Sequence, residues 1–146
     1  MLIQAILKSK PPGFVSVTSD LPVSGVIDIL AKKGIGAVLV VENGELIGIL
    51  SERDVVRSLS RCAAQTLTLL AADLMTRKPI TATPETTVEQ AMEMMTEGHF
   101  RHLPIVEDGQ LTGLVSIGDV VKARIDQSQH EVDTLRTYVS GSVLNA

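Results

Sequence analysis

The residues in this sequence best suited to chemistry are two copies of a Ser-x-x-Asp pattern, Ser51 to Asp54 and Ser116 to Asp119. A serine before a helix, followed three residues later by an acid, is typical of a capping box, in which the two side chains satisfy unpaired backbone N–H groups. The same arrangement suits a sugar phosphate. The amino end of a helix attracts anions, the hydroxyl donates to phosphate, and the carboxylate accepts from a cis-diol. One residue can serve in both ways, so both interpretations stay open here.

The segments that position these pairs form an internal repeat. Residues 80–124 align with residues 15–59 without an insertion. Each copy has the order β-α-β-β-α, with the serine at the start of its second helix. The Asn-Gly pair at 43–44 and the Asp-Gly pair at 108–109 predict hairpin turns between the second and third strands.

Two such copies are expected to fold as one body, because a three-stranded sheet with two helices cannot cover both of its own faces. We therefore predict a mixed α/β (α+β) fold in which the first helix of each copy ends at Gly34 or Gly98. The connection at residues 60–75 contains no Gly or Pro and is apolar, which favours a docked helical segment over a flexible tether.

A long helix is predicted after Asp119. Its apolar positions step by four and three residues, as in a heptad seam that contains one small polar residue: Val121, Ile125, Ser128, Val132, Leu135 and Val139. Such a seam either packs on its own domain or forms a homodimer contact, and the pattern leaves both open. Residues 140–146 are expected to fray.

Composition excludes several classes of function. The net charge of -4 and the 2% of aromatic residues argue against nucleic-acid binding. No apolar run is long enough to span a membrane, and the single Cys62 fits a reducing compartment, so we expect a cytoplasmic protein. No catalytic triad, paired carboxylates or metal-ligand set is evident, and the spacing of His99 and His102 on an extended segment does not favour a metal, so no enzyme activity is expected.

The tandem units, together with the segments DLMTRKPITATPETTVEQAM and RHLPIVEDGQLTGLVSIGDVV, resemble a pair of cystathionine beta-synthase (CBS) domains, or Bateman module. The resemblance implies two units about a pseudo-twofold axis and a long C-terminal helix. It places the first domain at residues 1–68 (core repeat 15–59), the second at 69–127 (core repeat 80–124), and the helix extension with its tail at 128–146.

Family members of this kind bind adenosine derivatives between the units: AMP, ADP, ATP, S-adenosylmethionine or NAD(H). Carried over, this implies that Asp54 and Asp119 bind ribose. The phosphate contacts implied are Ser51, Arg53, Ser116, Arg101 and His102. Weaker contacts to the adenosine are implied for Thr18, Thr83 and Pro104, although backbone capping also accounts for the two threonines.

The two units differ in their charges. Arg53 precedes Asp54, whereas Gly118 precedes Asp119, and Arg101 and His102 stand where the first unit has Gly36 and Ala37. One cleft can therefore draw its phosphate charge from both units, and equal occupancy of two sites does not follow from the sequence.

The sequence thus predicts a non-catalytic regulatory module that senses an adenine nucleotide, forms a homodimer and acts on an effector that the sequence does not identify. An alternative is an adaptor that binds a partner enzyme or transporter, with the Ser-x-x-Asp pairs serving only as caps. A nucleotide hydrolase is the third and less supported alternative.

Overall fold

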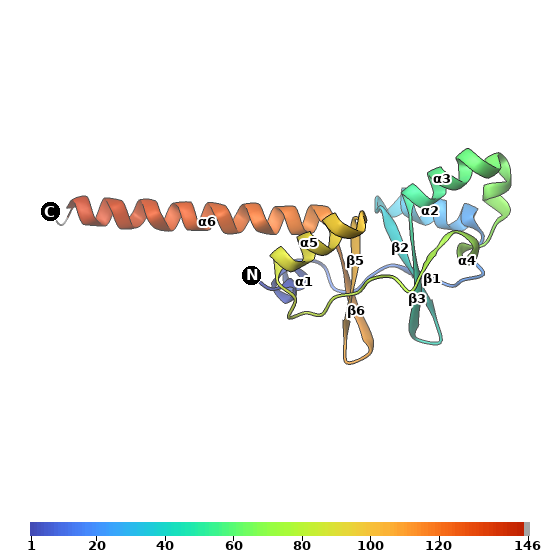
Figure 1. Ribbon diagram of the computed structural model, residues 1–146, viewed down its shortest axis with the longest axis horizontal. Coiled ribbons are helices and arrows are strands. Elements are labelled where there is room, and N and C mark those ends of the chain that lie inside the picture. The colour runs from blue at the N-terminus through green and yellow to red at the C-terminus, as the bar shows by residue number, and fades with distance from the viewer. Residues whose placement is uncertain (145–146) are drawn as a thin grey trace.

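The computed structural model describes the backbone of residues 1–144 and the side chains to residue 140, and it shows two β-α-β-β-α units side by side (Figure 1). The first unit has the predicted order, the second has it except that its first strand is only a single bridge, and both Ser-x-x-Asp helices begin directly after the serine. The elements of the first unit are β1 (Ser16–Val17), α2 (Val23–Lys33), β2 (Ala37–Glu42), β3 (Glu45–Ser51) and α3 (Glu52–Cys62). Those of the second are α5 (Val88–Gly98), β5 (His102–Glu107), β6 (Gln110–Ser116) and α6 (Ile117–Leu144).

The first strand of the second unit is reduced to a single bridge, which differs from the predicted order of β-α-β-β-α in each copy. In the first unit β1 runs parallel to β2, and the Leu39 N–H donates to the Val15 carbonyl at 3.0 Å. At the equivalent position the second unit has Pro104, which has no N–H to donate. Only Ala82 pairs there, with Ile105.

Both predicted hairpin turns are confirmed. Asn43 and Gly44 have φ angles of 52° and 79°, and Asp108 and Gly109 have φ angles of 51° and 77°. Positive φ at both central residues is what the tight turn between these strands requires. The turns fix the register of β2 with β3 and of β5 with β6, and so place each Ser-x-x-Asp pair at the same end of its hairpin.

Both first helices end at the predicted glycines, but the two glycines occupy different positions. Gly34 caps α2 in the left-handed conformation, with φ 61° and ψ 39°. In the second unit Gly98 is the last helical residue, and His99 takes the left-handed cap position with φ 55°. A side chain at Gly98 would meet the ring of Phe100 at 2.2 Å, so the glycine is needed for packing, while the histidine bears the unfavourable φ.

The segment before each unit packs on the other unit. Helix α1 (Ile3–Ser9) contributes Ile3 and Ile6 to the core of the second unit. Helix α4 (Ala71–Leu74) places Ala71 in the core of the first unit, and β4 (Thr76–Arg77) pairs with β3. This exchange confirms that the units form one body. The sequence boundaries at residues 68 and 127 stay predictions.

The connection between the units is docked, as predicted. Helix α3 leads into a 3₁₀ helix, η1 (Ala63–Thr68), and then into α4. Thr66 is fully buried and its hydroxyl pairs with that of Ser58, also buried, at 2.8 Å. A segment anchored in this way holds the strand that follows it in a fixed position.

Helix α6 leaves the body and projects far beyond it (Figure 1). Val120 and Ala123 are buried against the second unit, whereas every side chain from Ser128 to Ser140 is exposed. The alternative that this helix lies on its own domain is therefore wrong for residues 128–140. The predicted frayed tail is helical up to Leu144, and residues 145–146 lie outside the described residues.

The exchange predicts a specific sensitivity at Gly48. A Cβ at Gly48 would lie 2.5 Å from Met75 Sδ and 3.0 Å from the Thr76 carbonyl, which is backbone. We expect Gly48→Ala to lower the free energy of unfolding by about 1–3 kcal/mol, measured by urea denaturation. At Gly113 the same substitution meets the end of the Leu7 side chain, which can turn away, so Gly113→Ala should cost less. Equal losses at the two glycines would contradict this account.

Candidate functional site

Both Ser-x-x-Asp pairs form capping boxes. The Ser51 N–H donates to Asp54 Oδ2 at 2.8 Å, and the Asp54 N–H donates to Ser51 Oγ at 3.4 Å. The second pair has the same bonds, at 2.8 Å and 3.1 Å. In the first pair the Ser51 hydroxyl also donates to Asp54 Oδ2 at 3.0 Å. The structural role of the pattern is thus confirmed, and any binding role comes in addition to it.

The amide groups at these helix starts are largely occupied. The N–H of Glu52 donates to the Gly36 carbonyl at 2.9 Å, and the N–H of Ile117 donates to the Arg101 carbonyl at 2.8 Å. Two of the first three amides of each helix are therefore bonded within the protein. A phosphate at either helix start has to be held mainly by side chains, a limit that the sequence did not reveal.

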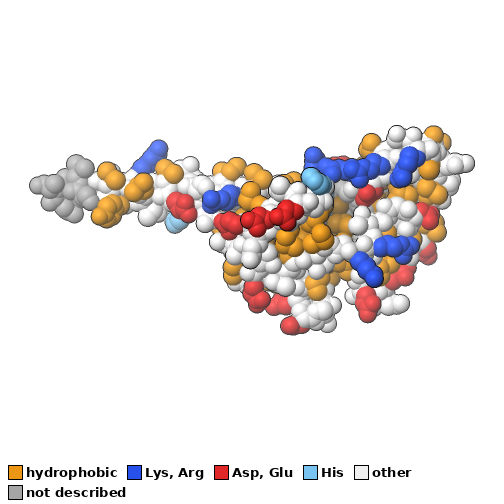
Figure 2. Space-filling model, in the orientation of Figure 1, with side chains coloured by type: hydrophobic (Ala, Val, Ile, Leu, Met, Phe, Trp, Pro, Cys, Tyr) orange, Lys and Arg blue, Asp and Glu red, His pale blue; other side chains and the backbone are white. Residues whose placement is uncertain are grey.

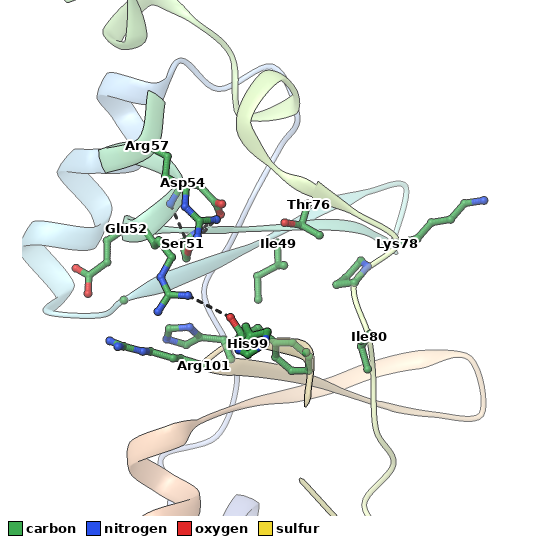
Figure 3. A pocket seen from close by; sticks show the side chains of 16 residues that line it. Ile49, Ser51, Glu52, Asp54, Arg57, Thr76, Lys78, Ile80, His99 and Arg101 are labelled. Atoms are coloured by element: carbon green, nitrogen blue, oxygen red, sulfur yellow. Dashed lines mark hydrogen bonds between the residues drawn. The ribbon is translucent and has the colours of Figure 1, made fainter. Parts of the chain in front are cut away.

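A pocket of about 340 Å³ opens between the two units beside the first Ser-x-x-Asp pair (Figure 3). Its lining includes five residues that the sequence proposed for ligand contact: Ser51, Arg53, Asp54, Arg101 and His102. The first three come from the start of α3 and the other two from the start of β5, across the junction where β3 faces β6. The expectation that one cleft draws on both units agrees with this geometry.

The pocket has a charged rim and an apolar wall. Four Lys or Arg residues and two carboxylates line it, and Lys and Arg side chains gather along the junction on the face shown in Figure 2. Ile49 and Ile80 lie on the wall, and 52% of Ile80 is exposed although it is a large apolar residue. Such a combination suits a ligand with one apolar and one anionic end.

Sequence reasoning missed two basic residues of this pocket. Arg57 lies beside Asp54 and Ser51, whereas Lys78 extends away from them (Figure 3). Arg57 was detectable, because residues three and four apart share a helix face and it follows Asp54 by three. Lys78 could not be placed from local pattern, since its position depends on the packing of the connection between the units.

One polar contact crosses the junction at the pocket. Arg53 Nη1 donates to the backbone carbonyl of His99 at 3.1 Å (Figure 3). The acceptor is the residue that caps α5 in the left-handed conformation. The position of α3 is thereby linked to the end of α5 by a side chain that the sequence proposed as a phosphate ligand.

His102 is half-buried in the pocket wall. Burial lowers the pKa of its imidazole below the ordinary value of 6.5, and Arg101 and Lys10 act in the same direction. The carboxylates of Glu52 and Asp119 raise the pKa but do not offset these effects. At neutral pH His102 is therefore an uncharged hydrogen-bonding group. Because the unfolded chain holds this proton more tightly, His102 reduces stability as the pH falls through about 6.5.

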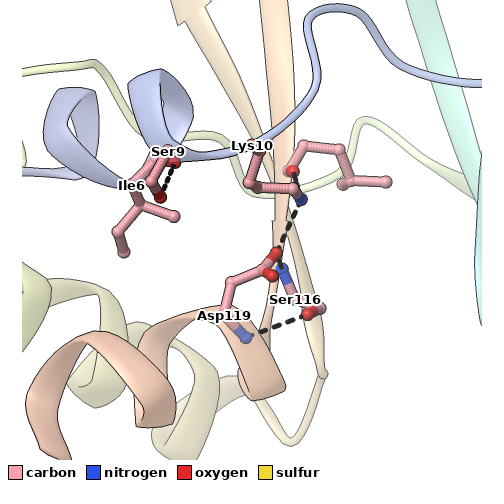
Figure 4. A network of polar contacts seen from close by, with 6 residues as sticks. Ile6, Ser9, Lys10, Ser116 and Asp119 are labelled. Carbon is pink, nitrogen blue, oxygen red and sulfur yellow. Dashed lines mark hydrogen bonds and ion pairs between the residues drawn. The ribbon is translucent and has the colours of Figure 1, made fainter. Parts of the chain in front are cut away.

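The second Ser-x-x-Asp pair is engaged by a residue from the start of the chain. Lys10 Nζ lies 2.7 Å from Asp119 Oδ2 and donates to the Leu114 carbonyl at 2.9 Å (Figure 4). Burial raises the pKa of Asp119, but the hydrogen bonds from Lys10 and Ser116 outweigh it and hold the pKa below its usual value. Neither Asp119 nor Ser116 lines the pocket described above.

The three weaker adenosine contacts also lie outside that pocket. Thr18 is exposed and donates to Asp20 at 2.6 Å, and Thr83 is exposed beside Thr86, whose Oγ1 accepts from the Thr83 N–H at 3.1 Å. Pro104 is buried in β5. Both threonine side chains bond to neighbouring side chains and not to the backbone, so the backbone-capping alternative is not seen for them. Their contact with a ligand stays a prediction.

The CBS-domain family model matches residues 7–61 and 71–126, so this chain belongs to the CBS-domain family and contains two such domains in tandem. The CBS domain-containing protein CBSX3, mitochondrial, of Arabidopsis thaliana is 36% identical over 139 residues, which cover 92% of this chain and 68% of that protein. A solved CBS-domain protein of Agrobacterium tumefaciens superposes with a TM-score of 0.83 at 37% identity, over 85% of this chain and 99% of that one.

Two related structures contain adenosine derivatives. A CBS-domain protein of Pyrobaculum aerophilum in complex with AMP is 27% identical, with a TM-score of 0.72 over 82% of this chain and 89% of that one. The CBS pair of protein MJ0100, with 5′-methylthioadenosine and S-adenosyl-L-methionine, is 26% identical, with a TM-score of 0.75 over 87% and 98%. Among residues 1–144 here, no helix combines the length and apolar character needed to cross a membrane.

The environment of His102 gives a directional prediction for NMR titration, with His102→Asn used to assign the imidazole signal. We expect an apparent pKa below 6.5 in the unmodified chain. Glu52→Gln removes an attractive carboxylate and should lower that pKa further, whereas Arg101→Gln removes a repelling cation and should raise it. Both side chains are exposed, so neither change should unfold the protein. A pKa above 6.5, or shifts of the same sign in the two variants, would disprove this description.

Proposed function

We propose that this chain is a regulatory module that binds an adenosine derivative in the pocket beside Asp54. The observation that carries the proposal is the meeting, in one pocket, of the Ser51–Asp54 pair, arginines from both CBS domains and an apolar wall. The AMP and S-adenosylmethionine complexes of related CBS pairs support the ligand class. The proposal includes no catalytic step.

In the proposed complex the ribose binds at Asp54. The capping bonds use its Oδ2, which leaves the charged carboxylate able to accept from the ribose hydroxyls through Oδ1. Hydrogen bonds to a charged group contribute roughly 1.5–3 kcal/mol each. The base packs against Ile49 and Ile80, which gives the exposed Ile80 a partner and removes apolar surface from water.

The phosphate is assigned to the cations at the rim. Arg53, Arg57 and Arg101 supply planar guanidinium groups, which bind phosphate oxygens in pairs. Ser51 supplies a hydroxyl that exchanges its bond to Asp54 Oδ2 for one to the phosphate. His102 contributes hydrogen bonding without charge. The excess of cations favours AMP, ADP, ATP or NAD(H) over S-adenosylmethionine, because the last carries no phosphate and has a cationic sulfonium.

Regulation is proposed to act through Arg53. A phosphate that draws Arg53 away from the His99 carbonyl removes a contact between the units. The ligand therefore has a different affinity for the junction with this contact formed and for the junction with it broken. The arrangement favoured by the ligand would then be read by an effector protein of unknown identity. A cytoplasmic location remains part of this proposal.

The second helix start is proposed to bind more weakly. A nucleotide at Asp119 would have to displace Lys10, which neutralises the carboxylate and donates to it at 2.7 Å. The assignments of Asp119 and Ser116 to a ligand, and those of Thr18, Thr83 and Pro104, stay predictions.

The test is to screen AMP, ATP, S-adenosylmethionine and NADH for binding by thermal shift and then to measure affinities by titration calorimetry. We expect Asp54→Asn to weaken the best ligand by roughly tenfold to a hundredfold, since it removes the charge that binds ribose. An asparagine still accepts the capping bonds, so the helix start is preserved. Asp119→Asn is the matched control and should change the affinity much less.

Two results would overturn the proposal. Absence of any thermal shift with all four compounds would favour the adaptor alternative, in which the Ser-x-x-Asp pairs are caps alone. Equal losses of affinity in the two aspartate variants would place the ligand elsewhere than the pocket beside Asp54.

A further inference from the structure

The projecting part of α6 has an apolar face that the body does not cover. The seam residues Val121, Ile125, Val132, Leu135 and Val139 are 40%, 61%, 43%, 62% and 52% exposed. At 100° per residue, this face lies roughly 120° around the helix from Val120 and Ala123, which pack on the second unit. Most of the stability of a helix in a protein comes from packing of its apolar face, so an exposed face of this kind is expected to have a partner.

The residue types of the seam fit a parallel pair of helices. In the heptad frame the a positions hold Ile125, Val132 and Val139, all β-branched, and the d positions hold Val121, Ser128 and Leu135. β-Branched residues at a with leucine at d favour two parallel strands over higher assemblies. Ser128, at another d position, is small and polar and reduces stability without preventing the pairing.

The flanking charges distinguish a parallel from an antiparallel pair of identical helices. In a parallel, in-register pair the g position Glu131 faces the e position Arg136 of the second copy, and this attraction occurs twice. A fully overlapping antiparallel pair would instead set Lys122 against Arg136 and Glu131 against its own copy. Both of those contacts are repulsive.

We propose that residues 121–139 of α6 form a parallel two-stranded coiled coil with the same segment of a second copy of this chain. The two CBS bodies then lie at the same end of the coil, each on the flank of its own helix away from the seam. No residue of this segment lines the pocket beside Asp54, so the coiled coil and the nucleotide site are independent and can fail separately.

The full-length chain tests this in sedimentation equilibrium. We expect the mass of two chains for the unmodified protein and of one chain for the double variant Val132→Lys, Leu135→Lys. The matched control adds the same charge to the outer face of the helix, His130→Lys with Thr134→Lys, and should remain a dimer. Because all four side chains are exposed, folding of the body should not change. A monomeric unmodified chain, a dimer that survives the seam variant, or loss of the dimer in the control would each overturn the proposal.

The orientation is tested by cross-linking in a Cys62→Ser background, which removes the single native thiol. With Ser128→Cys, a parallel in-register pair brings two d-position thiols together, and oxidation should join most chains as disulfide-linked dimers. Thr134→Cys on the outer face is the control and should cross-link little. In the antiparallel pair residue 128 faces residue 132, so failure of Ser128→Cys to cross-link in a dimeric sample would overturn the parallel arrangement.

Discussion

The structure depends on one constraint, the exchange of the segments that precede each CBS unit. Ile3 and Ile6 complete the core of the second unit, and Ala71 and Met75 complete that of the first. Because each core contains part of the segment that introduces the other unit, the two units cannot separate without exposing apolar surface. The same exchange brings residues 78–80 alongside the start of α3, and so forms one side of the pocket.

The two copies of the Ser-x-x-Asp motif lie in different environments. Both Ser-x-x-Asp pairs cap a helix, yet Asp54 faces a pocket with arginines, whereas Asp119 is held by Lys10. The equivalent of Lys10 in the other half of the repeat is Met75, which is buried against Gly48 and carries no charge. A single position therefore accounts for much of the difference between the two helix starts.

The sequence was sufficient for features set by near neighbours along the chain. The repeat, the hairpin turns and the capping boxes each depend on residues within a few positions of one another, and the structure has all of them. Helix α5 ends at Gly98 as predicted, but the left-handed cap falls on His99, because packing against Phe100 keeps the glycine inside the helix.

Features that depend on distant residues were not predictable in this way. The pair of Lys10 and Asp119 joins residues 109 positions apart, and no local pattern marks it. The exchange of α1 and α4 between cores is of the same kind, as is the position of Lys78 at the pocket. The bridge at Ala82 follows from the missing N–H of Pro104, which becomes informative only once the strand pairing is known.

The two copied helix starts differ in what holds their aspartates, and we propose that the one beside Asp54 accepts the nucleotide. A crystal structure of the chain grown with AMP tests this most directly. We expect AMP density in the pocket between Ile80 and Arg57, with Lys10 still bonded to Asp119. Density of equal strength at both aspartates, with Lys10 displaced, would contradict it.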